Sequence, residues 1–267
     1  MGKKDKTKAT TPRNSDGLTL DSAFKFSCYP GISCFGTCCR DVTIFLTPHD
    51  VIRMKNRLKI NSWDFIDRYT AVFYKGDNPF PFVRLQMEDT DQKECSFVDP
   101  VTGCSIYEDR PWSCRMYPLD MSEGDTYKII VSADKCKGLL EQREWLISEW
   151  LENQGIAQFD ELDHLYSQLT SHQAIHEKSI DNPQVSEMVF MATYDLDRFR
   201  RFVFESKFLQ MFDLPEEHIA LLKTDDKELL KLGFKWLGFG LINPLSIRIK
   251  TDVVESFLKE NEEKQND

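Results

Sequence analysis

Hydrophobic residues recur at helical spacing in a short stretch that begins near residue 47. Thr47 can cap this helix, Pro48 suits its first turn, and Asp50 can bond back to the cap backbone. Three apolar positions then follow three or four residues apart: Val51, Met54 and Leu58. The pattern predicts a helix here, and Ser62 is expected to cap a second short helix that runs through Tyr69.

Helical spacing returns after residue 138 and continues to about residue 240. The helices predicted there cover residues 141–153, 159–177, 194–212, 215–222 and 225–237. The third of them has the broadest apolar face, formed by Leu196, Phe199, Phe202, Val203, Leu209 and Phe212. Leu245 to Ile249 then alternates between apolar and polar residues, which predicts an edge strand.

Alternating stretches and turns occupy the region between the two helical parts. Residues 82–87, 95–98 and 127–132 predict strands, and Pro100 with Gly103 marks a tight turn. The pattern as a whole predicts an α+β fold, in which a small cysteine-rich, metal-stapled domain precedes a mainly helical domain. The expected parts are a disordered basic tail (1–20), a cysteine-cluster domain (21–140), a helical domain (141–250) and a charged C-terminal helix or tail (251–267).

Charge and hydropathy narrow the class of protein. The chain has 44 acidic and 34 basic residues and a formal net charge of −10, which argues against nucleic-acid binding. No apolar run approaches the roughly 18 residues that a membrane span needs. The N-terminus has a basic start but no apolar signal region, so we expect a cytoplasmic protein.

Eight cysteines, all in the first half of the chain, are the main chemical signal. They are Cys28, Cys34, Cys38, Cys39, Cys95, Cys104, Cys114 and Cys136. In a reducing cytoplasm, clustered cysteines favour metal binding over disulfides, so we expect all eight to be metal ligands. Gly31 and Gly36 supply the sharp turns that bring nearby thiolates to one point. The adjacent Cys38 and Cys39 need a turn to share one ion, or they serve two sites.

The later cysteines lie beside turns and cations. Cys95 and Cys104 flank the turn at Pro100 and Gly103, so a hairpin can bring them together. Pro111 begins a helical turn, whose amides are expected to lower the pKa of the Cys114 thiol. Arg110 and Arg115 flank Cys114, and both are expected to contact the bound metal group and offset its negative charge.

These motifs resemble the YkgJ family of cysteine-cluster proteins, also called the CxxCxxCC family. The resemblance rests on Cys28, Cys34, Gly36, Cys38, Cys39, Cys95-x-Phe97, Cys104-x-Ile106-Tyr107, Arg110-Pro111-x-x-Cys114-Arg115-x-Tyr117-Pro118 and Cys136-x-Gly138. The family usually has two residues between its first cysteines, whereas five separate Cys28 from Cys34 here. The resemblance implies a zinc or iron–sulfur site over about residues 24–140, and some relatives resemble flagellin lysine methylases.

The sequence leaves the metal and the function open. Zinc favours paired thiolates in knuckles, whereas an iron–sulfur cluster such as [4Fe–4S] accepts irregular spacings like these. A redox or binding module is the leading interpretation, with the metal group as its partner and a protein substrate or partner as a further possibility. The alternatives are a protein-modifying enzyme similar to flagellin lysine methylases and a carrier that delivers metal.

Other candidate residues have simpler structural interpretations. His164, His172 and His176 share one face of a predicted helix, but they lack the acidic partner of a zinc-binding helix and are expected to be solvated. His49 is expected at the surface, in the first turn of its helix. Asp195 is expected to cap a helix rather than to act with Asp197 in acid–base chemistry.

Overall fold

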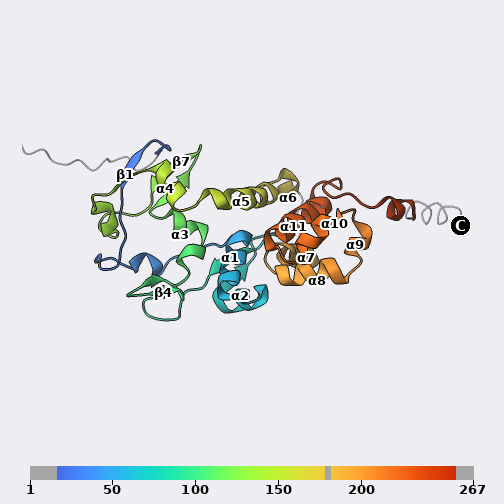
Figure 1. Ribbon diagram of the computed structural model, residues 1–267, viewed down its shortest axis with the longest axis horizontal. Coiled ribbons are helices and arrows are strands. Elements are labelled where there is room, and N and C mark those ends of the chain that lie inside the picture. Colours follow the sequence, from blue (N-terminus) through green and yellow to red (C-terminus); the bar gives the residue numbers. More distant parts are fainter. Residues whose placement is uncertain (1–16, 178–181, 257–267) are drawn as a thin grey trace, which may run out of the picture.

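A computed structural model describes residues 17–177 and 182–256 of the chain. It has an elongated shape, with the cysteine-bearing elements at one end and a group of helices at the other (Figure 1). Residues 1–16 of the predicted basic tail and residues 257–267 of the predicted C-terminal segment lie outside the described residues. Leu18, within the predicted tail, pairs with Tyr127 through two backbone hydrogen bonds.

The strands form four separate antiparallel pairs. They are β1 (Ala23–Lys25) with β8 (Glu144–Leu146), β2 (Thr70–Phe73) with β3 (Phe82–Leu85), β4 (Val98–Asp99) with β5 (Gly103–Cys104), and β6 (Leu119–Ser122) with β7 (Thr126–Ile129). The 3-10 turns are η1 (Thr37–Cys39), η2 (Tyr107–Asp109) and η3 (Lys137–Leu140). An isolated two-stranded pair is only marginally stable, so side-chain packing must hold these strands in place.

The helices fall into two sets along the chain. The earlier set is α1 (Pro48–Leu58), α2 (Ser62–Tyr69), α3 (Trp112–Met116) and α4 (Ile147–Asn153). The later set is α5 (Ala157–Thr170), α6 (Gln173–Glu177), α7 (Pro183–Thr193), α8 (Leu196–Glu205), α9 (Phe208–Met211), α10 (Glu216–Leu222) and α11 (Asp226–Leu241). The fold is therefore α+β, with helices following the cysteine-rich part, as the sequence predicts.

Three hydrophobic cores stabilise this arrangement. The first joins β1, α3, β8 and α4 through Phe24, Phe26, Met116, Leu119, Cys136, Trp145, Ile147, Trp150 and Ile156. Within it, the ring of Phe26 packs edge-on against Trp150 at a centroid distance of 5.2 Å. The indole of Trp145 donates to the carbonyl of Phe26 at 3.0 Å. This packing places β8 and α4 in the same core as β1, near the start of the chain.

Helix α1 contributes to both of the other cores. Val51 and Met54 pack in the second core, with α2 and β3. Ile52 packs in the third core, which is built largely from α5, α7, α8 and α11. Because α1 presents one face to each core, it joins the cysteine-rich part to the later helices.

The cap of α1 is confirmed, and the cap of α2 differs from the prediction. Thr47 and Asp50 form a reciprocal capping box, with backbone-to-side-chain distances of 3.0 and 3.2 Å. Asn61, not Ser62, caps α2 by accepting from the backbone N–H of Asp64 at 2.8 Å. The Ser62 hydroxyl instead donates to Asp197 at 2.8 Å, a tertiary contact that the local sequence does not encode.

The predicted helix over 141–153 is correct only in its second half. Residues 144–146 are extended and pair with β1, because Trp145 enters the first core opposite Phe24. Helix α4 therefore begins only at Ile147, where Glu149 accepts from the backbone N–H of Leu146 at 3.1 Å. Strand β1 itself has too short a pattern to be predicted from the sequence.

Two other predicted helices are each divided by a serine. The stretch 159–177 divides at Ser171, whose hydroxyl donates to the carbonyl of Ser167 at 2.7 Å as α5 ends. The stretch 194–212 divides at Ser206, which is extended and whose hydroxyl accepts from the N–H of Phe208 at 3.1 Å. That bond starts α9, so the apolar face continues across two helices instead of one.

The remaining differences concern α7 and the strands. Pro183 begins α7, capped by Asn182, whereas the sequence prediction used this proline only as a helix stop. The predicted edge strand over 245–249 is wrong for the described residues, where only Ile249 forms a bridge, with Phe212. The strands predicted at 82–87, 95–98 and 127–132 are present as the shorter or shifted β3, β4 and β7.

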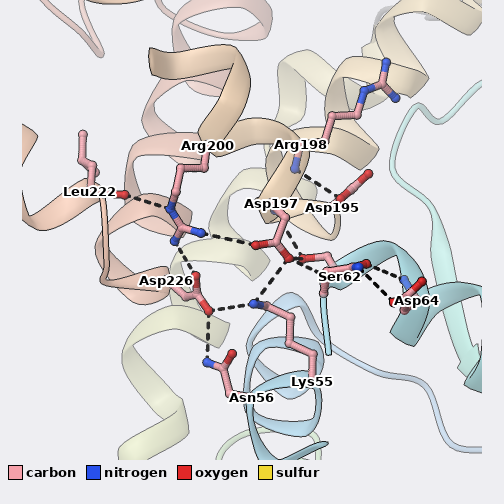
Figure 2. Close-up of polar contacts among 11 residues, drawn as sticks. Lys55, Asn56, Ser62, Asp64, Asp195, Asp197, Arg198, Arg200, Leu222 and Asp226 are labelled. Atoms are coloured by element: carbon pink, nitrogen blue, oxygen red, sulfur yellow. Dashed lines mark hydrogen bonds and ion pairs between the residues drawn. The ribbon is translucent and has the colours of Figure 1, made fainter. Parts of the chain in front are cut away.

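A network of charged groups links α1 and α2 to α8 and α11 (Figure 2). The ammonium of Lys55, on α1, is 3.0 Å from Asp226 and 3.6 Å from Asp197. Arg200 donates to Asp226 and to the carbonyl of Leu222. Burial disfavours the charged form of Asp226, but the bonds from Arg200 and Lys55 outweigh it and lower the pKa of this carboxyl. We call the side chains of Lys55, Asp197, Arg200 and Asp226 the ionic clasp.

We expect Lys55→Met to lower the free energy of unfolding by about 2 kcal/mol, because it leaves the partly buried carboxylates of Asp197 and Asp226 with one cation fewer. Lys55 is only 5% exposed, so water cannot replace the lost ammonium. Urea unfolding at neutral pH measures this change.

The matched control is Arg198→Met, which removes an exposed ion pair with Glu187 from the same helix, α8. Exposed pairs contribute about 0–1 kcal/mol, so this variant should unfold close to the wild-type midpoint. Equal losses for the two variants would contradict the role of the clasp.

Candidate metal centre

None of the eight cysteines forms a disulfide, and all lie in the described part of the chain. Cys136 is buried, Cys28 and Cys38 are exposed, and the other five are partly exposed. Electrostatic interactions among the thiols relate them in two neighbouring groups, which overlap because Cys38 also acts on Cys104. The first thiol group is Cys28, Cys34, Cys38 and Cys136, and the second thiol group is Cys39, Cys95, Cys104 and Cys114.

The first thiol group forms where the chain around residue 28 meets the chain around residue 136. Ser27 donates its backbone N–H to the carbonyl of Gly138 at 3.1 Å. A side chain at Gly138 would lie 2.6 Å from the carbonyl oxygen of Ser27, so only glycine permits this approach. The neighbouring Lys137 donates its backbone N–H to the sulfur of Cys34 at 3.2 Å. These contacts place Cys34 and Cys28 beside Cys136.

The electrostatics of Cys28 reflect the same neighbourhood. Burial, followed by the thiols of Cys38, Cys34 and Cys136, raises the pKa of Cys28 to about 11. The three neighbouring thiols thus disfavour the ionisation of Cys28, and a bound cation would relieve this repulsion.

Tyr117 lies beside the first thiol group, although the sequence analysis assigns it no chemical role. Burial and a hydrogen bond with Cys136 raise the pKa of the Tyr117 hydroxyl, and Cys38 and Cys34 add to this shift. The hydroxyl therefore stays protonated and can donate to sulfur. Tyr117 lies in the segment that carries the family resemblance, and this position is the feature of the sequence that could have indicated its role.

The second thiol group is assembled by backbone pairing. Cys95 donates its N–H to the carbonyl of Cys39 at 2.9 Å. Cys104 pairs with Val98 across the β4–β5 hairpin, as the flanking turn predicts. Cys114 lies close enough to Cys95 and Cys104 for both to raise its pKa.

The expected low pKa of Cys114 is not observed. Burial raises the pKa of this thiol, and Cys95, Asp50 and Cys104 raise it further. Helix α3 has only five residues and Cys114 is its third, so the helix N-terminus provides little compensation for burial. Arg110 is the group that acts in the opposite direction and lowers the pKa.

Cys38 and Cys39 join the two thiol groups. Both lie in the 3-10 turn η1, which follows Gly36 at a φ of 74°. A hydrogen bond from the Cys39 thiol lowers the pKa of Cys38 to about 7 and raises that of Cys39. Cys38 interacts with Cys28 and also with Cys104, whereas Cys39 interacts with Cys114 and Cys95. The two adjacent cysteines therefore lie between the two thiol groups.

Arg110 lies beside the second thiol group. Its guanidinium lowers the pKa of both Cys104 and Cys114, against the larger effect of burial. It is 7% exposed and stacks on the ring of Tyr107 at 3.6 Å. Hydrogen bonds to the Tyr107 carbonyl and to Gln154 fix its position. The cation is thus held near the thiols without a hydrogen bond to sulfur.

Arg115 contacts backbone instead. It donates to the carbonyls of Gln154 at 2.9 Å and Arg110 at 3.2 Å, and also to that of Glu108. Burial and the neighbouring arginines lower the pKa of Arg115 to about 10. This side chain ties α3 to the end of α4 and to η2, so its contacts favour a structural role over direct contact with a metal group.

Two residues of α1, His49 and Asp50, are buried and make contacts that the sequence analysis does not predict. His49 is 1% exposed rather than at the surface, and burial together with Lys227 and Arg53 lowers its pKa to about 4. Asp50 not only caps α1 but also accepts from the backbone N–H of Trp112 at 2.9 Å, which fixes the start of α3. Burial raises the pKa of Asp50 to about 6.

The remaining candidates lie away from the thiols or have structural partners. His164 bonds to Gln168, and His172 accepts from the N–H of Ala174 at 3.2 Å. The side chain of His176 lies outside the described residues. Asp195 caps α8 by accepting from the N–H of Arg198, as predicted, and Asp197 belongs to the ionic clasp.

The donor set fits a thiophilic metal group. Thiolates bind zinc and iron–sulfur clusters, and each thiol group supplies four of them. As the side chains lie, no three Cys, His, Asp or Glu groups within residues 17–177 and 182–256 converge to hold one ion. Binding would therefore require rotation of the cysteine side chains, and seven of the eight are at least partly exposed.

None of the helices in the described part of the chain has the length and apolar character needed to cross a bilayer. Comparison with curated proteins and with solved structures gave no match. A family model described as "CxxCxxCC: Putative zinc- or iron-chelating domain" matches residues 27–137, a range that contains all eight cysteines. The match shows that residues 27–137 are similar to this family, and it supports metal binding through the cysteines.

Proposed function

We propose that this protein is a metal-binding module that holds two metal centres, one in each thiol group. The observation that supports the proposal is that Cys28 interacts with Cys34, Cys38 and Cys136, whereas Cys95 interacts with Cys39, Cys104 and Cys114, with the Cys38–Cys39 turn between these free thiols. Four sulfur ligands complete the coordination of a zinc ion or of a [4Fe–4S] cluster. A cytoplasmic location would keep the thiols reduced and able to bind.

An iron–sulfur cluster is the preferred occupant. The ligands of each thiol group come from widely separated turns, such as those at Cys34 and Cys136, rather than from the paired knuckles typical of zinc. A cluster bound in this way would supply one-electron redox chemistry. Zinc remains the second candidate, and with zinc the module would be structural or regulatory.

The chain's own groups would compensate the charge of each centre. Four thiolates around a dication or a cubane core leave a net charge of about −2. Arg110 is placed to offset this charge at the second thiol group, since it already lowers the pKa of Cys104 and Cys114. At the first thiol group, Tyr117 and the backbone N–H of Lys137 are placed to donate to sulfur. No contact within the described residues favours the alternative, a protein-modifying enzyme.

Protein purified without air should contain iron and acid-labile sulfide, be brown and absorb broadly in the visible range. The reason is that sulfide-to-iron charge transfer accompanies thiolate-bound clusters, whereas zinc, with a filled d shell, is colourless. Metal analysis together with a visible spectrum measures this. A colourless protein with stoichiometric zinc would show that the centres hold zinc and not iron–sulfur clusters.

Replacing one cysteine in either group should remove about half of the metal, since each centre depends on its own four ligands. Cys34→Ser tests the first thiol group and Cys104→Ser the second, and the double variant should retain almost no metal. Ser33→Ala, an exposed neighbour of Cys34, is the control and should keep full occupancy. Complete loss in either single variant would mean that the thiols share one centre.

Arg110→Ala should weaken metal retention by about 10–100-fold, as is typical when a group that supports metal ligands is lost. Competition with a chelator measures retention, and far-ultraviolet circular dichroism checks that the fold persists. Arg248→Ala removes an exposed cation far along the chain and should leave retention unchanged. Wild-type retention in Arg110→Ala would exclude the proposed charge compensation.

A further inference from the structure

Three phenylalanines form an exposed cluster on the outer face of the β2–β3 pair. Phe73 and Phe82 stack with their centroids 5.6 Å apart, and Phe45 packs edge-on against both at 6.1 and 6.0 Å. Each of the three residues is about 40–50% exposed. Val72 and Tyr74 beside them are also exposed. Contiguous apolar surface of this kind is typical of an interaction site.

The same face continues along the chain beyond β3. Exposed positions alternate with more buried ones through Phe82, Arg84, Gln86 and Glu88. Pairing also continues, since Met87 bridges to Cys95 and Glu88 donates its N–H to the carbonyl of Glu94. The exposed residues therefore line one surface that extends for roughly 20 Å from Phe82 to Glu88.

A groove begins where the phenylalanines end. It has a volume of about 420 Å³ and is lined by residues 41–43, residues 84–89 and Lys93. Its two cations are Arg84 and Lys93, and Lys93 is paired with Asp41 at 3.2 Å. Phe45 pairs with Arg84 at its start, so the groove is continuous with the aromatic cluster. An extended peptide can thus contact the aromatic rings and the groove at the same time.

The far end of this groove is acidic. The segment 88–94 contains four carboxylates, at Glu88, Asp89, Asp91 and Glu94, and one lysine. Glu94 pairs with Arg40 at 3.1 Å, whereas Glu88, Asp89 and Asp91 form no ion pair within the described part of the chain. Three carboxylates beside an apolar cluster attract a cationic partner and repel anionic membranes and nucleic acid.

From this arrangement we propose that the surface binds an extended, basic amphipathic segment of a partner protein. One or two aromatic or aliphatic side chains of the segment pack on Phe45, Phe73 and Phe82. Lysine or arginine side chains about five residues along the segment reach Glu88 and Asp89. The proposal does not depend on what the thiol groups hold, since the aromatic cluster and Asp89 contact no thiol in the described part of the chain, and only Glu88 lies close enough to Cys95 to raise the pKa of its thiol.

Selection from a library of random peptides of about ten residues, long enough to span the face, tests this chemistry. The purified, metal-replete full chain is the target. Enriched peptides should combine an apolar residue with lysine or arginine at the predicted spacing. The best peptide should bind the Phe73→Thr/Phe82→Thr variant about tenfold more weakly or worse. Threonine keeps the β propensity of both strand positions, and thermal unfolding checks stability.

Charge and position are tested separately with the same peptide. Glu88→Gln/Asp89→Asn should weaken binding and reduce its dependence on salt. Leu245→Ser, which removes a fully exposed apolar side chain elsewhere, should bind like the wild type. Enrichment of acidic peptides, or equal binding by the threonine variant, would overturn the proposal. A dimer that dissociates on Phe73→Thr/Phe82→Thr substitution would also overturn it, because a second copy would then occupy the surface.

Discussion

The 3-10 turn that follows Gly36 and carries the adjacent Cys38 and Cys39 is the constraint on which the thiol arrangement depends. Successive side chains of an extended strand point to opposite faces, whereas this turn lets both residues interact with other cysteines. Segments around residues 28 and 136 meet on one side of this turn. The β4–β5 hairpin and α3 meet on the other side.

Helix α1 transmits this arrangement to the rest of the molecule. At its start, Asp50 accepts from the backbone of Trp112 and thereby fixes the helix that carries Cys114. Near its end, Lys55 enters the ionic clasp with Asp226. His49, one residue before Asp50, is buried close to Lys227 of α11. A change in the position of α3 would therefore shift α1, and α1 would in turn shift its contacts with α11.

Local signals in the sequence predict α1 because its cap and apolar face lie within one helix. The same holds for α8 and α11, which begin at Asp195 and Asp225, and for the turn between Cys95 and Cys104. Contacts between distant segments are not encoded locally. The pairing of Phe24 with Trp145 turns part of a predicted helix into a strand, and no spacing rule indicates it.

The candidate site also combines features that the local sequence predicts with features that it does not. The sequence identifies the eight cysteines and the nearby Arg110, because residue type and turn residues are local. It cannot assign Cys34 to Cys136, because that contact depends on the backbone approach at Gly138, more than a hundred residues away. Nor can it predict the high pKa of Cys114, since burial arises only when α3 packs against its neighbours.

The two thiol groups differ in how their charge would be compensated. The second thiol group has a buried guanidinium, that of Arg110, but also the buried carboxyl of Asp50 nearby. The first thiol group has a tyrosine hydroxyl and a backbone N–H, which are dipoles and not charges. It also contains the two exposed cysteines, Cys28 and Cys38, so water can screen it. In the proposed two-centre arrangement, the first centre is therefore the accessible one. The second contains no fully exposed cysteine and depends on a single cation, so loss of Arg110 should affect it far more than the first.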